Sequence, residues 1–187
     1  MAKGKTDSRA RLLQAAEQVA HRFGYGNTSL ADIAKEARVP LGNVYYYFKK
    51  KDDIGDAIID VRASRFHKLL EELNKADSPQ ERLCGFVRIK IKNSEDLARN
   101  GCPVGTLCSE LQKHGGSVAK HSRVLFATAL AWMESQFQAM GKGSESRALA
   151  VHLLSATQGV SLLAHTFRDP QMIRTESERL MKWIQAL

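Results

Sequence analysis

Three consecutive tyrosines at positions 45–47 constrain the fold of this chain more than any other feature. They lie in a segment that begins with Pro40, and proline suits the first turn of a helix. Neighbouring positions on a helix point in different directions, so the three rings cannot all face a core. Val44 and Phe48 are one turn apart and are expected to anchor the helix inward. The sequence therefore predicts a short helix with tyrosine rings on its surface.

The residues before this segment predict two more helices. The first is expected from about Ser8 to Phe23, and its apolar residues recur on one stripe: Leu12, Ala16, Val19, Ala20 and Phe23. Ser29 and Asp32 have the spacing of a capping box, which starts a second helix, and Arg38 and Val39 form the turn into the third. Three short helices, the last two joined by a tight turn, are a helix-turn-helix arrangement. In that arrangement the last helix enters the major groove of DNA.

The charge of the chain is concentrated in this N-terminal part. Residues 1–51 hold ten Lys or Arg and four Asp or Glu, a net charge of +6, whereas residues 52–187 carry +2. A local basic excess suits contact with a polyanion. Charge alone is equally consistent with a solvated surface, so the motif has to decide between the two.

The side chains of the predicted third helix suit DNA. Gly42 permits close approach of the backbone, and the Asn43 amide can contact a base edge or a phosphate. Tyrosine hydroxyls and the lysines at 49–51 suit phosphates.

Residues of about 9–56 resemble the DNA-binding domain of the TetR family. The resemblance rests on these features: a helix ending in phenylalanine and glycine, the Thr28-Ser29 pair, Ile33-Ala34, Ala37, and the run Gly42–Phe48 followed by Lys51. Pro40 departs from the small hydroxyl residue that is usual in the family, and Leu41 from its common polar residue. Leu41 can instead contact a thymine methyl group.

The resemblance implies two sets of DNA contacts. The residues implied at base edges are Leu41, Gly42, Asn43 and Tyr46. The residues implied at phosphates are Thr28, Tyr45, Tyr47, Lys49 and Lys51. Two of these have a local alternative: Thr28 can serve only in capping, and Tyr45 can be packed.

The rest of the chain predicts helices only. Hydrophobic residues make up 43% of the chain and charged residues 26%, which argues against disorder, and no segment alternates like a strand. Further helices are expected at about 51–75, 80–99, 102–114, 118–140, 145–167 and 171–186. The predicted fold is all-α with about nine helices. Residues 1–51 form a three-helix DNA-binding domain, and residues 52–187 form a helical bundle for effector binding and dimerisation.

The helix expected at 145–167 is apolar almost all round, so it needs cover on every face. A second subunit is one source of that cover, and the core of a monomer is the alternative. The next helix adds apolar residues on one stripe: Ile173, Leu180, Ile184 and Leu187. The resemblance implies a homodimer through the helices near 145–167 and 171–187. Such a dimer would bind palindromic double-stranded DNA.

The resemblance implies an effector pocket among the helices expected between residues 51 and 167. The candidate lining residues are Phe86, Ile89, Leu107, Trp132, Met133 and Phe137. Each of them is also an ordinary core residue. The spacing of histidines, cysteines and carboxylates predicts neither a metal site nor a cofactor.

Cys102 precedes Pro103 at an expected helix start, where the helix dipole favours a reactive thiolate. The segment from Asn100 to Pro103 resembles a Gly-Cys element of one TetR subgroup, some members of which respond to electrophiles or oxidants. The alternative is a small buried residue that shapes a tight turn. Cys102 is therefore a further candidate for the effector site.

These observations predict a sequence-specific transcriptional regulator that is a repressor, released from its operator by a small-molecule ligand or by thiol modification. An activator or a non-specific DNA binder is an alternative within the same class. The alternative from another class is an enzyme with a helical small-molecule pocket and an incidental basic end. No nucleophile–base motif or phosphate loop supports an enzyme. The N-terminus is polar, and polar residues interrupt the most apolar stretch, so a cytoplasmic protein outside the membrane is expected.

Overall fold

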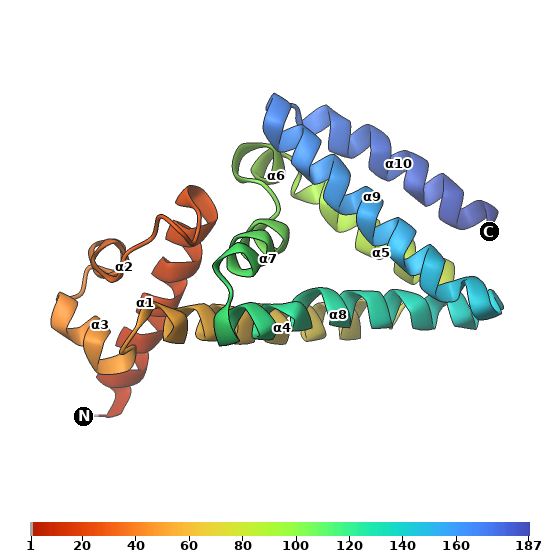
Figure 1. Cartoon of the computed structure of the whole chain (residues 1–187). Coiled ribbons are helices and arrows are strands. Elements are labelled where there is room, and N and C mark those ends of the chain that lie inside the picture. Colours follow the sequence, from red (N-terminus) through yellow and green to blue (C-terminus); the bar gives the residue numbers. More distant parts are fainter. Residues whose placement is uncertain (1) are drawn as a thin grey trace. The chain divides into compact units, whose positions relative to one another are not determined.

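The computed structural model describes residues 2–187, with side chains from Ser8 onward, and its regular elements are all helical (Figure 1). The N-terminal helices are α1 (Ala2–Phe23), α2 (Leu30–Ala37), α3 (Leu41–Tyr47) and α4 (Lys51–Leu73). They are followed by α5 (Pro79–Lys92), α6 (Ser94–Asn100), α7 (Pro103–His114) and α8 (Gly116–Ala139). The chain ends with a 3-10 turn, η1 (Gly143–Glu145), and with α9 (Ser146–Phe167) and α10 (Pro170–Ala186). The all-α prediction is confirmed.

The helix expected at 80–99 is divided into α5 and α6, which meet at Asn93. Asn93 has φ −104° and ψ 14°, and its side-chain amide donates to the carbonyl oxygen of Ile89 at 2.8 Å. The backbone N–H of Asn93 donates to the same carbonyl at 3.1 Å, and a side chain that bonds one turn back often bends a helix, so the break falls at this residue. α6 then ends at Asn100 and is followed by Gly101, whose φ of 79° lies in the region that favours glycine.

The chain divides into two compact units. The first unit comprises residues 1–64 and 106–123, and the second comprises residues 65–105 and 124–187. The functional boundary predicted after residue 51 falls at the start of α4. The assignment of DNA binding and effector binding to the two sides of that boundary remains a prediction.

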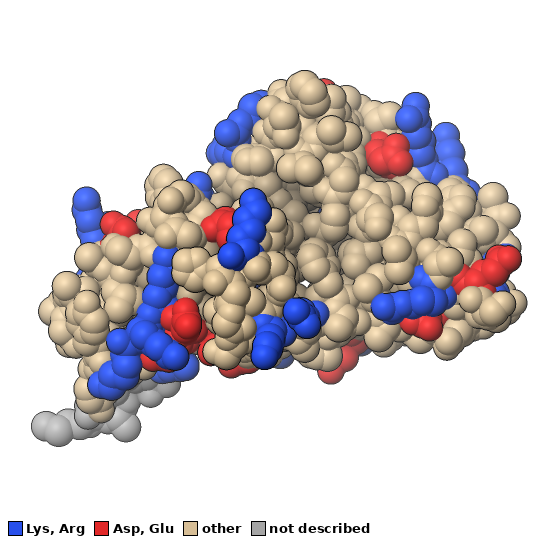
Figure 2. All heavy atoms as spheres, viewed as in Figure 1, with Lys and Arg blue, Asp and Glu red and all other residues tan. Residues whose placement is uncertain are grey.

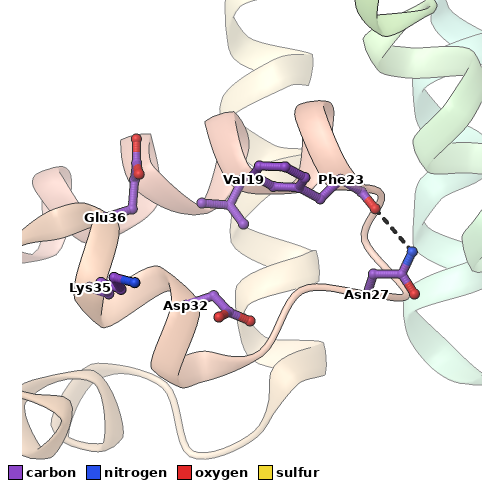
Figure 3. Close-up of a pocket in the computed structure, with 6 residues that line it drawn as sticks. All are labelled: Val19, Phe23, Asn27, Asp32, Lys35 and Glu36. Carbon is purple, nitrogen blue, oxygen red and sulfur yellow. Dashed lines mark hydrogen bonds between the residues drawn. The ribbon is translucent and has the colours of Figure 1, made fainter.

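The first unit has an apolar core to which α1, α2 and α3 contribute. The predicted inward residues of these helices are buried: Leu12, Ala16, Val19, Ala20, Ile33, Ala34, Ala37, Val44 and Phe48. Phe23, predicted on the same stripe, is instead 62% exposed in the last turn of α1. Its ring lines an open hollow of about 410 Å³, whose other walls include Val19, Asn27 and the α2 residues Asp32, Lys35 and Glu36 (Figure 3). Phe23 therefore borders the core without filling it.

In the second unit α10 packs against both α5 and α9 (Figure 1), and the second half of α8 contributes to the same core. Its main core cluster includes these buried residues: Leu83, Phe86, Val87, Met133, Phe137, Leu153, Leu180 and Ile184. A smaller cluster contains Leu97, Cys102, Val160 and Ile173. The stripe predicted on α10 for the dimer interface therefore packs into the core of its own protomer. Ile173, Leu180 and Ile184 are at most 4% exposed.

The segment Gly143–Phe167, which contains α9, is long and apolar enough to cross a membrane by length and composition. The polar interruptions in the sequence had suggested that it falls short of this. Core helices of folded proteins meet the same criterion, and one face of α9 packs within the second unit. Thr157 and Ser161 on that face are buried, and their hydroxyls donate to the carbonyls of Leu154 and Thr157.

Candidate DNA-binding surface

The candidate surface begins with α2, whose N-terminus is fixed by the predicted capping box. Ser29 has extended backbone, and its hydroxyl oxygen accepts the amide N–H of Asp32 at 3.1 Å. The Asp32 carboxylate in turn accepts the amide N–H of Ser29 at 2.9 Å. It also accepts the Ser29 hydroxyl, and these hydrogen bonds are the main reason that the pKa of Asp32 lies below its usual range.

The turn between α2 and α3 is formed by Arg38 and Val39, as predicted. Arg38 adopts a left-handed conformation with φ 54° and ψ 48°, which is uncommon for a residue other than glycine. The amide N–H groups of Arg38 and Val39 donate back to the carbonyls of Lys35 and Ala34. Pro40 follows in extended conformation and precedes the first residue of α3. The turn thus closes the end of α2 and starts the next helix within three residues.

α3 presents different side chains to the core and to the surface. Val44 is fully buried and Phe48, which follows the helix, is 2% exposed, so both anchor α3 as predicted. Leu41, Gly42, Asn43, Tyr45 and Tyr46 are exposed, and Tyr47 is half-buried. Tyr46 is the most open of the three tyrosines at 62%, and its ring meets the Tyr47 ring edge-on at 4.9 Å between centroids. Most residues of this seven-residue helix are therefore exposed, and the exposed ones are those predicted to contact DNA.

The three lysines after α3 differ in their environments. The backbone N–H groups of Lys49 and Lys50 donate to the Asp53 carboxylate, which fixes the start of α4. The Lys49 ammonium is exposed and donates to the carbonyl of Tyr45 at 3.0 Å. The Lys51 ammonium donates to the carbonyl of Gly26 at 2.8 Å. Each ammonium has three N–H groups, so one such bond leaves donors for a phosphate.

The turn between α1 and α2 is held by residues from α4 and α7. The Tyr25 ring is buried, and its hydroxyl donates to the carbonyl of Lys51 at 2.9 Å. The Lys51 ammonium lies 4.7 Å from the centre of that ring. The Glu110 carboxylate accepts the N–H of Gly26 at 2.7 Å. The carbonyl of Gly26 thus accepts a hydrogen bond from Lys51, and its N–H donates one to Glu110.

Thr28, a predicted phosphate contact, lies inside this turn. It is 3% exposed, and its hydroxyl donates to the carbonyl of Gly24 at 2.8 Å. In this position the side chain stabilises the turn, which corresponds to the local alternative. The hydroxyl has almost no surface to offer a phosphate.

Charge and burial shape the surroundings of the surface. Figure 2 shows Lys and Arg side chains on the part of the surface formed by α1–α3, interspersed with carboxylates. Burial lowers the pKa of Lys51, and the nearby Glu110 carboxylate opposes that effect. Burial and the carboxylates of α4 raise the pKa of Tyr25 above its ordinary value, so its hydroxyl remains a donor at neutral pH.

The candidate effector residues are only partly brought together. Phe86, Trp132, Met133 and Phe137 belong to the main core cluster of the second unit, where the rings of Phe86 and Trp132 are 6.2 Å apart. Ile89 is half-buried and lies outside that cluster. Leu107 is a buried residue of the first unit. The four clustered side chains are therefore the part of the predicted set that shares one environment.

Cys102 immediately precedes α7, as predicted. Its thiol sulfur accepts the amide N–H of Gly105 at 3.4 Å, and the side chain is 8% exposed within the smaller core cluster. The residue thus stabilises a buried helix start, which agrees with the structural alternative. Among the side chains described from Ser8 onward, no disulfide joins the three cysteines, and no group of His, Cys, Asp or Glu has an arrangement that could hold a metal ion.

Comparison with known proteins finds similar sequences among bacterial transcriptional regulators. Residues 12–58 match the family model for bacterial regulatory proteins of the tetR family. An HTH-type transcriptional regulator in the lacX 3′ region of Lactococcus lactis subsp. lactis is 27% identical over 179 residues, which cover 93% of this chain and 91% of that protein. The HTH-type transcriptional repressor NemR of Escherichia coli (strain K12) is 34% identical over 67 residues, which cover 36% of this chain and 34% of NemR.

The fold is also that of a known structure. The crystal structure of a TetR transcriptional regulator from Legionella pneumophila aligns with a TM-score of 0.83 at 22% identity, over 92% of this chain and 94% of that one. The family model covers the helix-turn-helix, and the lactococcal regulator aligns along nearly the whole chain. Residues 12–58 therefore belong to the tetR family of bacterial regulatory proteins, and the chain is a DNA-binding transcriptional regulator.

Proposed function

We propose that this protein is a sequence-specific repressor that inserts α3 into the major groove of double-stranded DNA. The exposed row on α3, which Val44 and Phe48 anchor from beneath, carries this proposal. Base edges would meet Leu41, Gly42, Asn43 and Tyr46. Phosphates would meet Tyr45, Tyr47, Lys49 and Lys51. Thr28 would contribute by shaping the turn before α2.

The protein would act as a homodimer through the outer face of α9. No Lys, Arg, Asp or Glu occurs between Ala148 and Phe167, although one side of that helix is exposed. The exposed side includes Val151 at 43%, Leu162 at 66%, Leu163 at 52% and Phe167 at 65%. A solvated helix face normally carries charged residues, so an uncharged face that displays four large apolar side chains favours cover by a partner. The exposed side of α10 would border the interface, because its apolar stripe packs inward.

A small-molecule ligand or thiol modification would release the repressor from DNA. The clustered side chains Phe86, Trp132, Met133 and Phe137 support an apolar ligand, and Cys102 is the candidate thiol for the second route, although its burial favours a structural role. The name of NemR supports the repressor assignment for this chain. The regulator would act on DNA in the cytoplasm.

The direct test uses duplex DNA that flanks the gene of this protein. Electrophoretic mobility shifts should reveal a salt-sensitive complex that unlabelled specific DNA removes far better than random DNA does. The Asn43→Ala variant should lose that preference while remaining folded. Transcripts of the adjacent genes should rise when the gene is deleted. Binding without sequence preference would contradict the proposal, and falling transcripts would identify an activator.

Oxidant sensitivity separates the two routes of release. If thiol modification releases DNA, a peroxide should dissociate the wild-type complex, and the Cys102→Ser variant should resist it. Serine is a good N-cap residue, so this substitution preserves the helix start. A wild-type complex that withstands the peroxide would leave ligand binding as the route.

A further inference from the structure

Arg11 connects α1 to the turn that starts the DNA-reading helix. Its guanidinium Nη2 donates to the carbonyl oxygen of Ala37 at 2.6 Å and lies 3.4 Å from the carbonyl oxygen of Arg38. Ala37 lies 26 positions after Arg11 in the sequence. This interaction is therefore a tertiary one, made to the backbone of the turn.

The end of α2 has a specific need for such a donor. The last carbonyls of any helix lack intrahelical partners. Here the N–H groups of Arg38 and Val39 satisfy the carbonyls of Lys35 and Ala34, and the Arg11 guanidinium satisfies that of Ala37. A positive charge at a helix C-terminus also interacts favourably with the helix dipole.

The turn itself holds an uncommon conformation. Arg38 has φ 54°, and such a residue keeps this conformation only where its surroundings impose it. α3 begins at Leu41, three residues after Arg38. The path of the backbone from Ala37 to Pro40 therefore sets the direction in which α3 leaves α2.

We infer that Arg11 is a positioning residue for DNA recognition, which acts by holding the α2–α3 turn. This inference rests on the proposed DNA-binding function and deepens it. A cationic side chain in a DNA-binding domain could also act as a phosphate contact. The salt dependence of binding separates the two roles, because each lost phosphate contact lowers the slope of log K against log[salt] by about 0.9.

The test compares Arg11→Lys, Arg11→Ala and a matched control, Arg22→Lys. Arg22 is also in α1 and also reaches α2, but it pairs with the exposed Glu36 side chain at 2.8 Å. Fluorescence anisotropy with a duplex carrying the specific site gives the affinity and the salt slope of each variant. Circular dichroism confirms that each variant is folded.

Lysine keeps the charge of Arg11, but its side chain is shorter and its ammonium lacks the rigid plane that directs Nη2 at the turn. Both Arg11 variants should therefore weaken specific binding by roughly 5- to 30-fold, because the substitution affects the α3 helix of each subunit in the dimer. The salt slope of Arg11→Ala should equal that of the wild type, and Arg22→Lys should bind normally. If Arg11→Lys binds like the wild type, or if Arg11→Ala lowers the slope by about 0.9, the inference is wrong.

Amide hydrogen exchange in the absence of DNA provides the second measurement. The N–H groups of Arg38 and Val39 should exchange faster in Arg11→Lys than in Arg22→Lys or the wild type. Unchanged exchange would overturn the inference even if DNA binding fell. A wild-type protein that binds no specific DNA would overturn the proposed function, whereas the exchange rates would still decide whether Arg11 holds the turn.

Discussion

Gly42 and Val44 lie two residues apart in α3 and have opposite surroundings. Apart from the chain neighbours of Gly42 and the backbone of its own helix, nothing lies within 4 Å of where a Cβ on this residue would be, whereas Val44 is fully buried. In a helix that serves DNA recognition, open space at an exposed glycine is space for the ligand. A substitution at Gly42 should therefore affect DNA recognition, and a substitution at Val44 should affect the stability of the fold.

Replacement of Gly42 by alanine should weaken DNA binding without loss of stability. The new methyl group meets nothing in the protein, and alanine is favoured over glycine in helices by up to about 1 kcal/mol. The same methyl group would stand between the backbone of α3 and the base edges. Thermal unfolding should show equal or higher stability, and anisotropy should show an affinity reduced by roughly tenfold.

Val44→Ala provides the opposite control. Removal of two buried methyl groups should lower the free energy of unfolding by about 2 kcal/mol. If Gly42→Ala binds DNA like the wild type, the backbone of α3 does not approach the bases.

Single side chains could be predicted from the sequence where helical spacing alone decides their environment. Val44 and Phe48 had to be buried together, and three adjacent tyrosines had to include exposed ones. Thr28 and Arg11 depend on partners that spacing does not supply. The hydroxyl of Thr28 donates within the turn, and the guanidinium of Arg11 donates to a residue 26 positions away.

At the scale of elements, the capping box gives α2 a defined response to acid. The pKa of Asp32 is lowered, chiefly because the Ser29 hydroxyl donates to its carboxylate. A lowered pKa means that Asp32 contributes its full stabilisation above the unfolded-state pKa of about 3.9. The contribution falls as the pH drops below that value and is lost below the folded-state pKa.

The Asp32→Asn variant isolates this contribution. The difference in melting temperature between wild type and variant should be largest at neutral pH. It should shrink as the pH falls below about 4, because the wild-type carboxylate is then protonated as well. A difference that stays constant across that range would show that the carboxylate charge has no part in the cap.

Gly55 of α4 permits the close contact between that helix and the α1–α2 turn. A Cβ at this position would lie 2.7 Å from the Tyr25 hydroxyl and 2.9 Å from a methyl carbon of Val118. Gly55→Ala should therefore lower the free energy of unfolding by about 1–2 kcal/mol, although alanine is the better helix former. Chemical denaturation measures this cost.

The Tyr25→Phe background provides the control for Gly55→Ala. Phenylalanine lacks the hydroxyl that the new methyl group would meet, so Gly55→Ala should cost less there than in the wild type. Equal costs in both backgrounds would show that Tyr25 is not the obstacle.

Most helix limits could be predicted because glycine, proline and capping residues mark them. The division between α5 and α6 could not, since it lies at the single residue Asn93, which leaves the helical conformation although its backbone N–H still bonds to the Ile89 carbonyl. The partner of the α10 stripe was also beyond prediction. Periodicity shows that one side of a helix is apolar, but it does not show whether that side meets the same protomer or another.

At the scale of the whole molecule, the outer face of α9 predicts the oligomeric state. Phe167→Glu and Leu163→Glu should each convert a dimer into a monomer at micromolar concentration, because a charge would be buried without a partner. Light scattering after size-exclusion chromatography measures the mass. Weaker specific DNA binding should accompany the loss of the dimer, since the two α3 helices would no longer bind as a unit.

Phe23→Glu is the matched control for the α9 variants. Phe23 is 62% exposed and Phe167 is 65% exposed, so the two substitutions change equally open aromatic positions. Phe23→Glu should remain dimeric. A dimeric Phe167→Glu protein would place the interface elsewhere.

The proposed effector site was the part of the molecule least open to prediction. Phe86, Trp132, Met133 and Phe137 are the residue types that line apolar pockets, and they are equally the types that fill cores. A sequence contains no sign of which buried side chains yield to a ligand. The residues proposed to contact DNA were easier to predict, because side chains that bind DNA have to remain on the surface.

Selection of binding sites from random duplex DNA with the wild-type protein tests most directly whether two α3 helices bind DNA together. Two symmetry-related α3 helices should enrich one inverted repeat, and Asn43→Ala should fail to enrich the same sequence. Enrichment of no sequence, or of a motif without two-fold symmetry, would contradict the claim that a pair of α3 helices reads DNA.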